Sequence, residues 1–329
     1  MASAQDHLWL EAAARLAGRA RPLSRPNPGV GAIVVRDGRV IARGWTQAGG
    51  RPHAEAAALS GVDATGATLY VTLEPCAHQS ARGPACADVV AASGVARVVI
   101  GCGDPDPRTA GAGIARLRAA GLAVALLDCP TSRASLAGYL SQRLLGRPHV
   151  TLKLALSLDG CLALTNGESQ WITGPEARAH THLMRAQSDA ILVGGGTLRA
   201  DSPRLDVRLP GLEAQSPQRF VLTQGSAPQG WAALSSPEAI HTLPDIQYLF
   251  IEGGAQTAAS FLRAGLVDRL LLYRAPILIG AGRPGIADLG LTALADAHDR
   301  WQLSDRRVLG KDTLEVYDCL PCLPASSQL

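Results

Sequence analysis

The sequence lacks the long hydrophobic runs, the aromatic richness and the one-sided charge that mark several large classes of protein. No apolar run approaches the ~18 residues that a membrane-spanning helix needs. Aromatic residues are 4% of the 329, and the formal net charge is only +3, with no run of Lys or Arg. A membrane partner, a nucleic-acid partner and a base-stacking surface are therefore not expected.

The N-terminus also lacks the basic start and apolar centre of a secretory signal peptide. Its first 20 residues are typical of an amphipathic helix, so we expect a cytoplasmic protein. There the seven cysteines would be reduced thiols, metal ligands or core residues and not a disulfide framework. Cys102, Cys129 and Cys161 lie in or beside apolar strands and are expected in the core. Cys319 and Cys322, in a proline-flanked tail, could form a redox or zinc pair.

Length and patterning predict two α/β domains. About 150 residues per domain gives two, and 47% hydrophobic residues are enough for two cores. Strand-like and helix-like segments alternate along both halves, which favours layered α/β domains. A strand restarts at His149, just after Pro148, so we place the domains at 1–147 and 148–329.

Several elements follow from local patterns. Asp37-Gly38 between two apolar runs predicts a β-hairpin. One helical stretch is expected over 132–148 and one long strand over 269–280. The proline-rich region 202–244 is expected to be mostly loop, with one strand at 219–223.

The strongest chemical signal in the first half is a set of three metal-ligand side chains. His53, Cys76 and Cys86 offer one imidazole and two thiolates, which suits Zn²⁺ with a fourth position open to water. Zinc lowers the pKa of such a water. Glu55 is not needed as a ligand and could move protons between the water and a leaving amine. We expect helices to begin near His53 and Cys86.

A His-x-Glu followed by a Pro-Cys turn is the signature of zinc nucleobase deaminases, although nine residues separate the two cysteines here, not two. Two other readings stay open. One is a zinc nucleoside or tRNA deaminase with a non-reductase second domain. The other is a non-catalytic scaffold that holds zinc structurally, which the open fourth position and Glu55 disfavour.

The second half offers two strands that end in glycines, at 193–196 and 251–254. Backbone N–H groups at a helix N-terminus suit an anionic ligand, but neither segment is the G-x-G-x-x-G fingerprint. Four arginines near these glycines could hold phosphates: Arg185, Arg199, Arg204 and Arg208.

Taken together, the motifs resemble the bifunctional riboflavin-biosynthesis deaminase/reductase family over nearly the whole chain. In the first half the resemblance depends on Pro26-Asn27-Pro28, His53-Ala-Glu55, Tyr70 to His78, Pro84-x-Cys86 and Asp104-Pro-Asp-Pro107. In the second half it depends on Lys153-x-Ala155, Ser157-Leu-Asp159-Gly160, Gly167 to Thr173, Arg185 to Leu192, Gly196-Thr197, Asp201-x-Pro203 and Glu252-Gly-Gly254.

The resemblance implies a cytidine-deaminase-like α/β/α layer followed by a dihydrofolate-reductase-like α/β domain. It implies Zn²⁺ on His53, Cys76 and Cys86, with Glu55 as the catalytic proton shuttle. The implied NADPH contacts are Ala155, Trp171, Thr197, Asp201 and Gly254. The implied substrate contacts are Asn27, Ser169, Arg185, Leu205, Arg208 and Glu252, and Lys153 is a catalytic candidate near the hydride.

For three of these residues a structural role is the alternative: a turn for Asn27, core packing for Trp171 and a cap or turn for Asp201. The implied activity is hydrolytic deamination of a diaminopyrimidinone ribotide, then NADPH-dependent reduction of its ribosyl group to ribityl. A homo-oligomer is expected.

The chain departs from the family pattern at two contacts. Thr46 stands where some relatives have a histidine, so Arg51 or Arg82 could serve the substrate phosphate instead. Thr223-Gln224 stands where the family often has Asp-Ser, which puts one cofactor contact in doubt.

Overall fold

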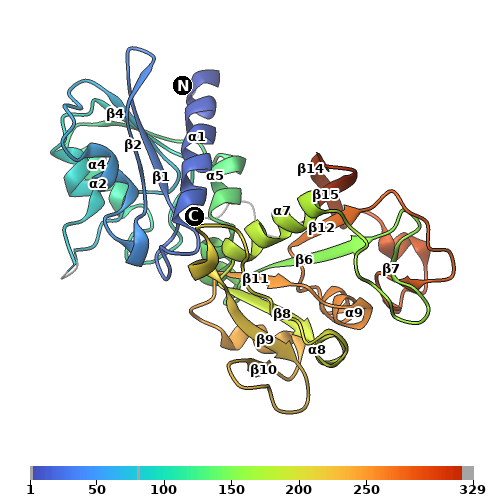
Figure 1. Ribbon diagram of the computed structural model, residues 1–329. Coiled ribbons are helices and arrows are strands. Elements are labelled where there is room, and N and C mark those ends of the chain that lie inside the picture. The colour runs from blue at the N-terminus through green and yellow to red at the C-terminus, as the bar shows by residue number, and fades with distance from the viewer. Residues whose placement is uncertain (1–2, 80–81, 321–329) are drawn as a thin grey trace. The chain divides into compact units, whose positions relative to one another are not determined.

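In the computed structural model, which describes residues 3–79 and 82–320, the chain divides into two compact units (Figure 1). The first unit ends at Gly146 and the second begins at Arg147, and each has its own large sheet. No helix in the described ranges is long and apolar enough to cross a membrane.

The first unit is built on a five-stranded sheet of order β2-β1-β3-β4-β5. β1 runs antiparallel to both neighbours, and β3, β4 and β5 are parallel. Its strands are β1 (Gly31–Arg36), β2 (Arg39–Trp45), β3 (Thr68–Val71), β4 (Arg97–Ile100) and β5 (Ala123–Leu126). Its helices are α1 (Ala4–Ala17), η1 (Gly18–Ala20), η2 (Ala48–Gly50), α2 (Ala54–Leu59), α3 (Cys86–Ala91), α4 (Ala112–Ala119), α5 (Pro130–Ser135) and α6 (Ala137–Leu145).

Two glycines allow helices to pack closely against opposite faces of this sheet. A Cβ on Gly31 would lie 1.9 Å from the Ala13 carbonyl oxygen of α1, and one on Gly44 would lie 2.3 Å from that of Ala54 in α2. Gly44 pairs with Ala32, so it faces the side opposite to Gly31. The predicted α/β/α layer is confirmed, as is the hairpin, whose Asp37 and Gly38 have φ of 52° and 72°.

The Asp6 carboxylate ties α1 to the sheet. It accepts hydrogen bonds from both Arg97 nitrogens (2.8 and 3.0 Å), from the Tyr70 hydroxyl (2.9 Å) and from the Ser3 backbone N–H (2.8 Å). The Arg97 guanidinium, against the penalty of burial, holds the pKa of Asp6 well below its ordinary value. This contribution to stability is present above the unfolded pKa and is lost as the pH falls through the folded one.

Replacing Asp6 by Asn should therefore destabilise the first unit by about 2 kcal/mol at pH 7, since the buried donors lose a charged acceptor. Urea dependence of hydrogen exchange in β1 and β3 measures this unit alone. Asp88→Asn is the matched control because the Asp88–Arg116 pair is exposed, so its loss should cost less than about 1 kcal/mol. Equal effects of the two changes would contradict the prediction.

The second unit has an eight-stranded sheet of order β10-β9-β8-β11-β6-β12-β15-β14, parallel from β10 to β12 and antiparallel beyond. Its strands are β6 (His149–Leu156), β7 (Cys161–Ala163), β8 (Ala190–Gly194), β9 (Gln218–Leu222), β10 (Ala232–Leu234), β11 (Tyr248–Ile251), β12 (Arg269–Arg274), β13 (Arg283–Pro284), β14 (Trp301–Leu309) and β15 (Asp312–Cys319). Its helices are α7 (Pro175–Ala186), α8 (Gly195–Asp201), η3 (Glu213–Gln215), η4 (Pro237–Thr242), α9 (Ala255–Arg263) and η5 (Leu294–Ala297). β7 and β13 form a separate two-stranded ribbon.

The central parallel strands β8 and β11 are buried on both faces. One core cluster joins Val150, Leu152 and Phe261, and another joins Ile191, Phe250 and Tyr273. Strands covered on both faces need near-continuous apolar sequence, which β8 and β11 have. Their carboxyl ends lead into α8 and α9, so the two glycine segments lie at one edge of the sheet.

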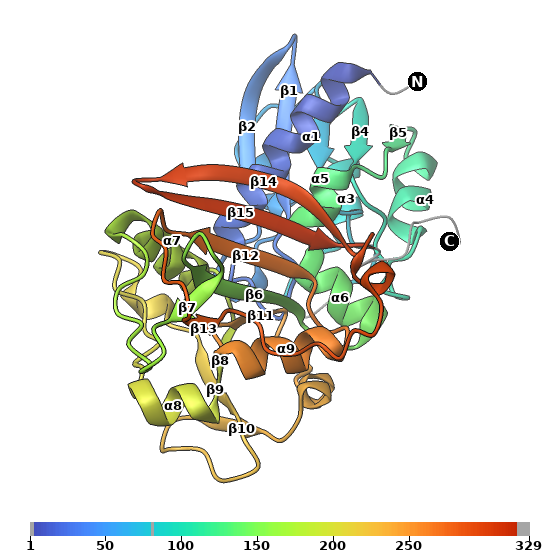
Figure 2. The ribbon, with the colours of Figure 1, turned by 90° about the vertical axis from the view of Figure 1, so that its right-hand side faces the viewer.

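Four expectations about elements were wrong or incomplete. The strand expected over 269–280 ends at Arg274, and Pro276, two residues later, has no N–H for a ladder. The helical stretch over 132–148 is two helices, α5 and α6, that break at Leu136. A second strand, β10, lies within 202–244. The long β14–β15 hairpin (Figure 2) was not predicted.

The structure confirms the predictions for three of the cysteines. Cys102, Cys129 and Cys161 are buried, which confirms them as core residues. Cys319 is the last residue of β15 and is partly exposed. Cys322 lies outside the described residues, and so does the Cys319–Cys322 pair as a whole.

Candidate active sites

The three predicted metal ligands come together in the first unit. His53 is the N-cap of α2, Cys86 is the first residue of α3, and Cys76 lies in the loop after β3. His53 Nδ1 lies 3.2 Å from the Cys86 sulfur and 3.7 Å from the Cys76 sulfur. Ligands of a tetrahedral zinc are separated by roughly 3.6 Å, so the donor set and its spacing fit Zn²⁺.

The surroundings of Cys76 favour its thiolate form. Hydrogen bonds from the Cys86 side chain, from His53 and from the Cys86 backbone N–H hold the pKa of the Cys76 thiol well below its usual range, although burial opposes this. The Cys86 N–H to Cys76 sulfur distance is 3.3 Å. A first-turn N–H therefore stabilises the neighbouring sulfur, as expected at a helix N-terminus.

Glu55 lies in the first turn of α2 and is 3% exposed. Burial raises its pKa to about 7, against the opposing effect of His53. Its carboxyl lines the same pocket of ≈ 310 Å³ as His53 and Cys76. A carboxyl so placed can hold or release a proton at neutral pH.

Asn27 has a contact that the sequence did not indicate. Its Nδ2 donates to the Gly50 carbonyl oxygen at 3.1 Å and lies 3.1 Å from His53 Nε2, on the ring edge opposite the sulfurs. A Cβ on Gly50 would lie 2.6 Å from the Asn27 side chain, so a glycine is required there. Asn27 thus contacts the His53 ring edge that faces away from the sulfurs, and it also lines the pocket.

The outer wall of this pocket carries Arg51 and Arg82, the two predicted substitutes for the absent histidine. Arg51 donates to the Pro84 carbonyl and Arg82 to the Gly49 carbonyl. Thr46 is buried, and its hydroxyl accepts the Val30 N–H at 3.0 Å. Thr46 thus bonds to the backbone of Val30, and it lines the pocket together with both arginines.

Glu74, Asp104 and Tyr139 also line the pocket, and no role was predicted for them. The buried Glu74 carboxylate accepts three backbone N–H groups from the segment 104–114, at 3.1 to 3.3 Å. Asp104 in turn accepts the Tyr139 hydroxyl at 2.7 Å. The sequence signal for Glu74 is a carboxylate at the end of an apolar strand, from which no role was predicted.

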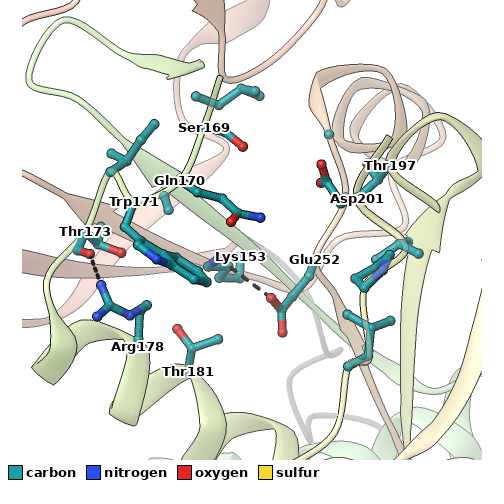
Figure 3. A pocket seen from close by; sticks show the side chains of 18 of the residues that line it. Lys153, Ser169, Gln170, Trp171, Thr173, Arg178, Thr181, Thr197, Asp201 and Glu252 are labelled. Carbon is teal, nitrogen blue, oxygen red and sulfur yellow. Dashed lines mark hydrogen bonds and ion pairs between the residues drawn. The ribbon is translucent and has the colours of Figure 1, made fainter. Parts of the chain in front are cut away.

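The second unit holds a larger pocket of ≈ 460 Å³. It is lined by every residue that the resemblance implied for this half: Lys153, Ala155, Ser169, Trp171, Arg185, Thr197, Asp201, Leu205, Arg208, Glu252 and Gly254. Figure 3 shows Lys153, Ser169, Trp171, Thr197, Asp201 and Glu252 among them. Arg204 lines the pocket too, and Arg199 lies at the glycine segment, since a Cβ on Gly195 would be 3.2 Å from its Nη1. Arg199 lies in the last turn of α8.

A buried carboxylate with two cations stands at the centre of this pocket. The Glu252 carboxylate accepts hydrogen bonds from Arg185 Nε (2.6 Å) and Nη2 (3.0 Å), and Lys153 Nζ lies 3.7 Å away. Although burial favours its neutral form, Lys153 and Arg185 hold the pKa of Glu252 below the ordinary value. Glu252 is therefore ionised, and Lys153 points toward it (Figure 3).

Trp171 forms one side of the pocket, and its predicted alternative, core packing, is wrong. The side chain is 66% exposed. The Arg178 guanidinium lies 4.8 Å from the ring centroid and donates to the Thr173 carbonyl, so Arg178 holds the indole in place (Figure 3). Asp201 is the last residue of α8 and lines the pocket across from it.

Two family models match the chain. Residues 3–102 match the cytidine and deoxycytidylate deaminase zinc-binding region, and residues 148–234 and 238–314 match the RibD C-terminal domain. The zinc-binding match contains His53, Glu55, Cys76 and Cys86.

Full-length relatives agree with both matches. The riboflavin biosynthesis protein RibD of Escherichia coli is 38% identical, with 94% of this chain and 98% of the relative covered. A solved RibD of Acinetobacter baumannii has a TM-score of 0.83 at 34% identity, covering 96% and 99%. A Thermotoga maritima diaminohydroxyphosphoribosylaminopyrimidine deaminase/5-amino-6-(5-phosphoribosylamino)uracil reductase has a TM-score of 0.84 at 29% identity, with the same coverage.

Proposed function

The chain belongs to the RibD family of riboflavin biosynthesis proteins, and we propose that it deaminates a diaminopyrimidinone ribotide and then reduces the product. The observation that carries the proposal is the presence of two complete pockets on one chain. One has three zinc-type ligands beside a buried carboxyl, and the other has a Lys–Glu–Arg cluster. We place deamination in 1–147 and reduction in 148–329.

In the first pocket His53, Cys76 and Cys86 would hold Zn²⁺. When bound, the metal supplies a nucleophile at neutral pH by lowering the pKa of water to about 7. Glu55 takes the proton of the attacking water and passes it to the leaving amine, so that a C–O bond forms, the C–N bond breaks and ammonia departs. Asn27 contacts the pyrimidine.

In the second pocket Ala155, Trp171, Thr197, Asp201 and Gly254 would hold NADPH. The cofactor supplies the hydride, and the chain positions the reactants and handles one proton. Ser169, Arg185, Leu205, Arg208 and Glu252 bind the ribotide. Lys153 is the proton donor, because its ammonium group lines the pocket and lies 3.7 Å from Glu252.

A coupled assay tests both halves. Zinc-loaded protein is given the diaminopyrimidinone ribotide and NADPH, and ammonia and NADPH are followed in one tube. Equal amounts of ammonia released and NADPH consumed are the expected result. Ammonia without NADPH consumption would contradict the second half of the proposal, and neither change would contradict both.

We also propose a cytoplasmic homo-oligomer. The edge strand β14 supports self-association, because the apolar side chains Leu303 and Val308 on it are exposed. Light scattering after size-exclusion chromatography should give a multiple of 34.2 kDa. A mass of one chain at micromolar concentration would contradict it.

A further inference from the structure

Helix α7 contributes Arg178, Thr181, His182 and Arg185 to the lining of the second pocket, and the proposed function uses only Arg185. Arg178, His182 and Arg185 are spaced four and three residues apart, so they share one helix face, and all three line the pocket. Arg178 holds Trp171 and Arg185 holds Glu252. His182 has no role in the reactions above.

The contacts of His182 fix which ring nitrogen carries its proton. Nδ1 accepts the backbone N–H of Arg208 at 3.2 Å. A backbone N–H can only donate, so Nδ1 is bare and the neutral ring is protonated on Nε2. Burial and the cations of Arg185 and Arg208 lower the pKa of His182, against the opposing effects of Glu252 and the Asp206 carbonyl. The ring is thus a neutral N–H donor at pH 7.

His182 Nε2 also lies 3.3 Å from Nη2 of Arg208. Both atoms carry protons, so neither accepts from the other. The Asp206 carboxylate forms an ion pair with the other terminal nitrogen of Arg208, Nη1, at 3.4 Å. This contact orients the guanidinium and leaves Nη2 beside the imidazole. Two adjacent donors, one of them charged, are an arrangement that binds an anionic oxygen.

We propose that His182 Nε2 and Arg208 Nη2 together bind a phosphoryl oxygen of the ribotide, which makes His182 a specificity-determining residue of the reductase. The inference rests on the proposed function and adds His182 to the residues that bind the ribotide in the same pocket. Five cationic side chains and two carboxylates line that pocket, which suits a dianion.

The cofactor also carries phosphates, but the glycine segments form a separate group. A Cβ on Gly254 would lie 3.2 Å from the Thr197 hydroxyl, so these two residues adjoin each other. His182 and Arg208 instead adjoin Asp206, whose carbonyl oxygen accepts Arg185 Nη1 at 2.9 Å. The donor pair therefore belongs with the residues assigned to the ribotide.

The test compares His182→Ala with His182→Gln, whose amide can accept the Arg208 N–H and still donate. KM is measured for the deaminated ribotide, for its dephosphorylated riboside and for NADPH. His182→Ala should raise the ribotide KM roughly tenfold and leave the riboside and NADPH values unchanged. His182→Gln should restore most of the loss, and equal melting temperatures exclude a folding effect.

A double-mutant cycle with Arg208→Met separates direct binding from positioning. If His182 only holds Arg208, His182→Ala has no further effect in the Arg208→Met background, and the proposal is wrong. Direct binding predicts a further severalfold rise in ribotide KM. Equal losses for ribotide and riboside, or a raised NADPH KM, would also overturn it. Failure of the proposed function looks different, since the wild type would then oxidise no NADPH with the ribotide.

Discussion

Replacing Glu55 by Gln should lower the rate of ammonia release by about 10²–10⁴-fold without loss of zinc. The amide has nearly the same shape but cannot take a proton from water or give one to the leaving amine. Glu55 is not one of the three ligands that lie within 4.8 Å of one another, so the metal content should stay near one per chain. Ammonia release and metal analysis on the same preparation measure the two quantities.

The second pocket provides the internal control. Deaminated ribotide, prepared separately, bypasses the first reaction, and its reduction by the Glu55→Gln protein should proceed at the wild-type rate. Cys86→Ser is the matched variant in the metal site, and it should lose zinc as well as ammonia release. Full ammonia release by Glu55→Gln would show that another group carries the proton.

The sequence was most informative where chemistry requires particular residue types at short range. A His-x-Glu at a helix start and a Pro-Cys turn after an apolar strand indicate a metal site without knowledge of the fold, and the structure brings His53, Cys76 and Cys86 together. Strands buried on both faces, such as β8, are apolar throughout and were equally visible.

Elements that are stabilised by partners distant in sequence could not be predicted from local sequence patterns. β14 is mostly exposed, and a bulge between Leu303 and Asp305 interrupts its alternation, so its sequence has no strand period. Its pairing with β15 gives it structure. Likewise, the sequence alone does not distinguish Arg178 and His182 from other polar residues of a surface helix, because their partners Trp171 and Arg208 lie 7 and 26 residues away in sequence.

Replacing Arg185 by Met should both abolish the reductase and destabilise the second unit by about 3–5 kcal/mol, the cost of leaving a buried carboxylate without its main partner. Glu252 would lose two hydrogen bonds from Arg185 and keep only Lys153 at 3.7 Å. Urea dependence of hydrogen exchange in β6, β11 and β12 reports this unit alone. Arg269→Met is the matched control, since its partner Asp318 is partly exposed and the loss should be about 1 kcal/mol.

The pH dependence separates an uncompensated charge from a packing defect. In the wild type Glu252 has a lowered pKa, so its contribution is present above the unfolded value of about 4.3 and is lost only as the pH falls through the folded one. In Arg185→Met the buried carboxyl can be neutralised by a proton, so the stability deficit should narrow as the pH falls from 7 toward 4. Arg185→Met combined with Glu252→Gln should recover much of the stability at pH 7 but none of the activity. A deficit that is constant with pH and unrelieved by Glu252→Gln would mean that Arg185 acts by packing, and that the charge balance around Glu252 does not hold this pocket together.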